Sequence, residues 1–115
     1  MPQKRNRLIE LFIGNLSNAI THEILVKAIK NKNKEIAFYY QKEIENAINI
    51  SKKYREKINP INAPISEKDV SYIKTKIIKK VNAELKIRIL KGYKNINLAL
   101  VDELVDKVLK EIKIN

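Results

Sequence analysis

The chain has 115 residues, of which 44% are hydrophobic and 32% are charged, so its composition predicts one globular domain over residues 1–115 rather than a disordered segment. The absence of cysteine excludes disulfide frameworks, zinc ribbons, iron–sulfur clusters and thiol nucleophiles. One histidine, His22, excludes a multi-histidine metal site, and two glycines, Gly14 and Gly92, exclude a glycine-rich phosphate loop.

The chain is strongly basic. Lys and Arg number 24 against 13 Asp and Glu, which gives a net charge of +11 and favours anionic partners such as nucleic acid. Only four of the basic residues are Arg, and Ile and Asn are also abundant. Because Lys, Ile and Asn have AT-rich codons, the same charge is expected of a protein whose composition merely follows its genome. The net charge therefore fits either a binding role or the composition alone.

The first part of the chain shows helical spacing with one interruption. Apolar residues share a helical face from Leu8 to Ile20, and a rotated apolar set follows from Ile24 to Ile29. A rotated stripe indicates a break or a kink, and Thr21 is suited to cap a new helix there. We therefore expect two helices, at about 5–20 and 22–31.

A second long helix is predicted over about 33–58, since one apolar stripe runs from Ile36 to Ile58 and Pro60 follows. Residues 59–66 have no helical period and form a short connector. Ser66 is placed to cap a third helix, which has its core face along Val70, Ile73, Ile77, Val81 and Leu85. Gly92 fits a left-handed stop at about residue 91.

The segment after Val81 supports two structures. Leu85, Ile87 and Ile89 alternate as in a strand, so a hairpin of 85–90 with 96–101 is an alternative. A continuous helical stripe from Leu98 to Ile112, with Asn97 as its N-cap, favours helix instead. We prefer helix, because an isolated hairpin is marginal in water.

The predicted fold class is therefore all-α, an antiparallel bundle of four to five helices, with 33–58 and 67–91 as its central hairpin. The residues expected in its core are Phe12, Leu16, Tyr40, Ile44, Ala47, Val70, Ile73, Ile77, Val81, Leu104, Val105 and Val108.

The charge excess peaks in residues 61–94, which carry nine basic against three acidic residues. Opposite the core face of the third helix lie Lys68, Tyr72, Lys76, Lys79 and Lys86. Lysines beside one aromatic ring suit phosphate contacts without base readout, so this stripe is the candidate site for DNA or RNA. The alternative is an ordinary solvated lysine face.

Three apolar residues predict self-association. Phe38 falls on the far side of its helix from the core stripe, and Ile87 and Leu90 fall away from the core face of the third helix. Either another helix of the chain packs on them, or they contact a second chain, with a dimer the first expectation.

No catalytic site, metal site or cofactor is predicted. His22 precedes Glu23 without the second histidine of a zinc-binding helix, and no serine has a recognisable base partner. No apolar stretch approaches the roughly 18 residues of a membrane span, so we expect a cytoplasmic protein without a membrane partner. The sequence thus predicts a non-catalytic basic binding protein or, alternatively, a homo-oligomeric helical module.

Overall fold

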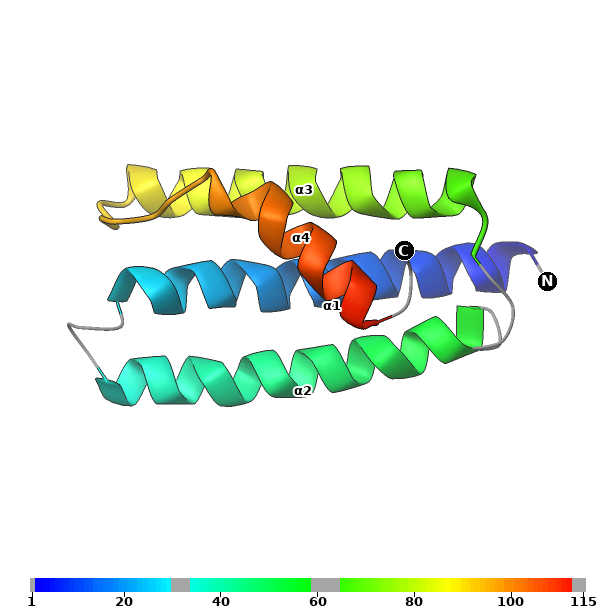
Figure 1. Cartoon of the computed structure of the whole chain (residues 1–115), viewed down its shortest axis with the longest axis horizontal. Coiled ribbons are helices and arrows are strands. Elements are labelled where there is room, and N and C mark those ends of the chain that lie inside the picture. The colour runs from blue at the N-terminus through cyan, green and yellow to red at the C-terminus, as the bar shows by residue number, and fades with distance from the viewer. Residues whose placement is uncertain (1, 30–33, 59–64, 113–115) are drawn as a thin grey trace.

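The computed structural model describes residues 2–29, 34–58 and 65–112, except for the side chains of 2–5, 29, 34, 36 and 37. These residues form four α-helices and no strand, which confirms the all-α fold class (Figure 1). The helices are α1 (Pro2–Ile29), α2 (Lys34–Ile58), α3 (Glu67–Leu90) and α4 (Leu100–Glu111).

The predicted break at Thr21 is wrong, since α1 continues unbroken from Pro2 to Ile29. The apolar stripe rotates because α1 is the middle helix and packs against α2, α3 and α4. A helix with neighbours on several sides needs apolar residues around most of its circumference. Thr21 is accordingly a buried residue inside the helix and not a cap.

Three helices lie side by side in the order α3, α1, α2, and α4 crosses the front of α1 and α3 (Figure 1). In the described residues α2 and α3 share no contact, so the prediction that they form the central hairpin is wrong. Helices α2 and α3 are consecutive in the sequence, but α1 lies between them. Because α1 has apolar residues around more of its circumference, the central position buries it best.

The predicted core is largely confirmed. Nine of its twelve members are buried, and Tyr40, Ala47 and Val70 are half-buried. Tyr40 and Ala47 lie where α2 meets α1 at the edge of the bundle. There the backbone carbonyl of Ala47 accepts a hydrogen bond from the Asn15 side chain at 2.9 Å. The α1–α2 contact is therefore partly polar.

Helix α3 begins and ends as predicted. The Ser66 hydroxyl accepts a hydrogen bond from the Asp69 backbone N–H at 3.2 Å, which caps the first turn. At the other end Gly92 has a φ of 99°, and the Tyr93 N–H donates to the Arg88 carbonyl at 3.0 Å. This bond, together with that from Gly92 N–H to the Ile89 carbonyl, completes a Schellman stop.

The hairpin alternative for 85–101 is excluded, since residues 85–90 continue α3. Arg88, which the helix places within the apolar face, is half-buried and lies over the ring of Tyr93 at 5.6 Å. Asn97 is not the N-cap of α4, which begins at Leu100. Its side-chain oxygen instead accepts from the Ala99 N–H at 3.0 Å, in a turn just before the helix.

Candidate functional site

The outer side of α3 carries three of the predicted site lysines. Lys68, Lys79 and Lys86 are all exposed, at intervals of about three and two helical turns, so they follow one line along the helix. We call these three residues the outward lysine line. None of them forms an ion pair within the described residues. Of the described helices, α3 contacts α1 and α4 alone, so it is an edge helix and this line faces solvent.

The other two predicted site residues turn toward α1. The Tyr72 hydroxyl donates a hydrogen bond to the Glu10 carboxylate of α1, and this bond raises the pKa of Tyr72. Lys76 lies over the Tyr72 ring at 5.8 Å and is half-buried. Both side chains therefore make contacts within the chain, and the Glu10 carboxylate lies beside Tyr72. The predicted stripe therefore divides into an outer line, of which Lys68 also borders a hollow with Glu10 and Asp69, and an inner edge at Tyr72 and Lys76.

Two hollows follow the line where α1 and α3 meet, and we call them together the α1–α3 seam. One, of about 370 Å³, is lined by Asn6, Ile9, Glu10, Lys68, Asp69 and Tyr72. The other, of about 280 Å³, is lined by Gly14, Ser17, Asn18, Thr21, Lys80, Ala83 and Glu84. The side chains lining the seam include three carboxylates and two ammonium groups, so it lacks the charge excess of the whole chain.

Two buried hydroxyls line the second hollow. Ser17 Oγ and Thr21 Oγ1 have no hydrogen-bond partner among the described residues, although both residues are at least nine-tenths buried. Next to them Gly14 has no atom within 4 Å of where a Cβ would stand, so there is open space at this point of the seam. This feature is not among those predicted from the sequence. Its signal is a set of small and polar residues recurring on one side of an otherwise apolar helix, at Gly14, Ser17, Asn18 and Thr21.

His22, in the C-terminal half of α1, contacts α2. Its ring stacks on Tyr40, with 5.0 Å between ring centroids, and its Nδ1 lies 3.4 Å from the Glu43 carboxylate. Burial lowers the pKa of His22, against the Glu43 charge, which raises it. The described residues hold no group of three or more His, Asp or Glu side chains that would suit a metal ion.

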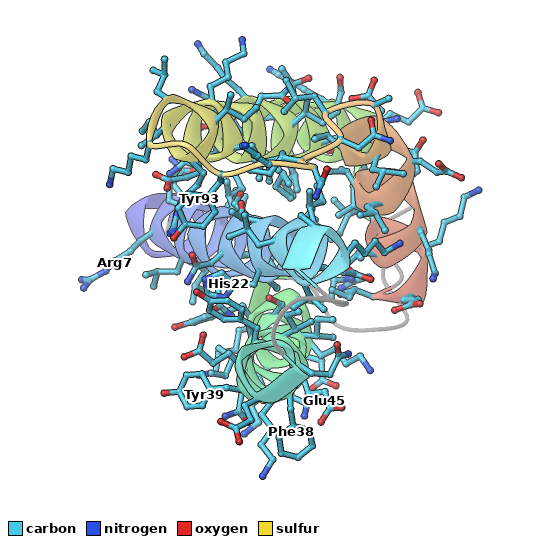
Figure 2. All side chains as sticks on the ribbon, turned by 90° about the vertical axis from the view of Figure 1, so that its left-hand side faces the viewer. Arg7, His22, Phe38, Tyr39, Glu45 and Tyr93 are labelled. Carbon is cyan, nitrogen blue, oxygen red and sulfur yellow. The ribbon has the colours of Figure 1, made fainter. Side chains whose placement is uncertain are left out.

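The predicted contact residues are exposed. Phe38 is 64% exposed, Ile87 44% and Leu90 87%. Within the described residues these side chains therefore keep much of their apolar surface open to solvent. Phe38 projects from the outer edge of α2, far from α3, so the three residues do not form one patch (Figure 2).

Comparison of the chain with protein-family models, with curated proteins and with solved structures gave no match. None of the helices, over the residues that the structure describes, is both long and apolar enough to cross a membrane.

Proposed function

We propose that this protein is a non-catalytic helical protein that binds DNA or RNA through backbone phosphates by means of the outward lysine line of α3. The observation that supports this most is that Lys68, Lys79 and Lys86 are exposed, unpaired among the described residues and free of interleaved acids. Between them the outer side of α3 carries the exposed residues Ser71 and Thr75. The α3 carboxylates of Asp69 and Glu84 line the seam instead.

The chemistry of this line favours binding without sequence preference. A lysine ammonium is a point charge that suits a phosphate but has no planar group to read a base edge. The arginine nearest to the line, Arg88, lies over the Tyr93 ring and is half-buried. Phosphate contacts alone give affinities that depend steeply on salt and little on sequence.

The proposal is tested by fluorescence anisotropy with labelled duplex DNA and single-stranded RNA, each in two unrelated sequences, over a series of salt concentrations. We expect similar affinities for the sequences of each kind. Each phosphate neutralised adds about −0.9 to the slope of log affinity against log salt on duplex DNA. Failure to bind either nucleic acid at low salt would contradict the proposal.

A homo-oligomeric assembly role is the second candidate function. It is favoured by the exposure of Phe38, Ile87 and Leu90, since apolar side chains of this size anchor protein interfaces. Sedimentation equilibrium over a range of concentrations tests it. A mass that rises from 13.4 kDa toward twice that value is expected for a dimer, and a constant monomer mass would reject it.

A further inference from the structure

The bundle has two unlike faces. Figure 2 shows α3, α1 and α2 stacked in one layer, with α4 on one side of it and no described helix on the other. Arg7, Tyr39 and Tyr93 project on the side away from α4 (Figure 2). We call this side the α4-free face.

The spacing of residues along each helix identifies further members of this face. On α1, one side of the helix carries Arg7, Leu11, Asn18 and His22. Successive members of this set are four, seven and four residues apart, which is close to one, two and one helical turns. On α2, Ile50 lies three turns after Tyr39. On α3, Ile87 lies one turn after Ala83, which lines the seam opposite Gly14 and Asn18.

Most of the exposed large apolar side chains gather on this face. Among the described residues, at least six of the ten exposed large hydrophobic residues belong to it: Leu11, Tyr39, Ile50, Tyr72, Ile87 and Tyr93. Tyr72 belongs because it borders the seam and bonds to Glu10 of α1. A large exposed apolar patch on a protein surface marks an interaction site.

We propose that the α4-free face is the contact surface for a second copy of this chain. This inference rests on the assembly role given above as the second candidate function. It differs from the sequence prediction, because Phe38, one of the three predicted contact residues, lies off this face.

Charge and size identify a second copy as the occupant. The seam that runs along the face carries three carboxylates and two ammonium groups in a chain of net charge +11. A surface with both signs complements itself, whereas a nucleic acid requires a basic one. The bundle measures 46 × 23 × 22 Å, so the layer offers roughly 1,000 Å². A standard interface needs about 800 Å² from each partner.

The centre of the α1–α3 seam also has room for side chains of a second copy. Gly14 and Ala83 leave open space in the seam beside Ser17 and Thr21, and a side chain of the second copy can fill it. Contact across this face leaves Lys79 and Lys86 of the outward lysine line away from the contact centre, whereas Lys68 borders the seam.

The experiment compares the self-association of three proteins by sedimentation equilibrium. Leu11→Glu places a charge on the face at a residue that is already 43% exposed, so the monomer tolerates it. Phe38→Glu is the matched control, because it adds the same charge at an exposed apolar residue off the face. We expect the wild type to form dimers, the Leu11 variant to associate at least about thirtyfold more weakly, and the Phe38 variant to be unchanged.

Circular dichroism melts at low concentration check that both variants fold. Gly14→Arg provides a second disruption, because the space beside Gly14 accepts a side chain in the monomer and blocks the seam in the dimer. Dimers that survive Leu11→Glu and Gly14→Arg but dissociate with Phe38→Glu would overturn this surface while leaving an assembly role standing. A wild type that stays monomeric at high concentration would overturn both.

Discussion

The imidazole of His22 stacks on the phenol of Tyr40 with 5.0 Å between ring centroids and an angle of 28° between the rings. The two residues come from α1 and α2, so the contact between the most closely packed pair of helices includes an imidazole, which titrates near neutral pH. The Glu43 carboxylate of α2 and the Arg88 guanidinium of α3 act on the same ring with opposite signs.

This contact predicts a stability that depends on pH. Burial lowers the pKa of His22 below its ordinary value of 6.5, so the unfolded chain takes up this proton before the folded one. The free energy of unfolding should therefore fall as the pH drops through 6.5 and should recover above it. His22→Phe keeps an aromatic ring against Tyr40 but cannot titrate, and it should remove this part of the dependence.

Urea unfolding of both proteins at about pH 7.5 and about pH 5.5 measures the difference. Carboxylate titrations are common to the two proteins and cancel in the comparison. The same loss of stability in wild type and variant would show that His22 does not contribute.

Ile77 tests the core. It is fully buried where α3 packs on α1 and α4, so Ile77→Ala should lower the free energy of unfolding by about 2–5 kcal/mol through lost burial and a residual cavity. Ile89→Ala on the same helix is the control, since Ile89 is exposed and its truncation should change stability by less than about 0.5 kcal/mol. Equal effects in denaturant unfolding would contradict the register of α3.

Thr21→Val tests the unpartnered hydroxyl of the seam. Valine has nearly the same shape, so the change removes a buried group that has no hydrogen bond and should stabilise the monomer by about 1 kcal/mol.

Ser51→Ala is the opposite case. The Ser51 hydroxyl donates to the Ala47 carbonyl at 2.8 Å and accepts from the Asn15 amide at 3.2 Å. Its loss should destabilise by about 1 kcal/mol. Thermal unfolding at low concentration distinguishes the two, and a destabilised Thr21→Val would mean that this hydroxyl has a partner.

The nucleic-acid proposal predicts a specific salt effect. Replacing Lys79 and Lys86 by Gln removes two charges from the outward lysine line and should reduce the salt slope on duplex DNA by about two. Lys52 and Lys53, exposed on α2, provide the matched control, because their replacement by Gln lowers the net charge equally. An equal loss of affinity in both variants would show that overall charge acts rather than the α3 line.

The sequence by itself determined which segments are helical, where α3 begins and ends, and most of the core. These features depend on local causes. An apolar stripe at helical spacing specifies one buried face. Ser66 caps the first turn of α3, and Gly92, which has no side chain, readily adopts the left-handed conformation just after its last turn. The same local pattern identified the lysines on the outer side of α3.

The tertiary structure decided how the helices are arranged and which side chains meet. The rotated stripe of α1 suggested a break at Thr21, because periodicity does not distinguish a kinked helix from a straight one surrounded by neighbours. The partners of Tyr72 and Asn15 lie 62 and 36 residues away in sequence, a separation at which no spacing rule operates. Likewise, the α4-free face exists only because α4 crosses the other side of the layer, and that choice depends on the packing of all four helices together.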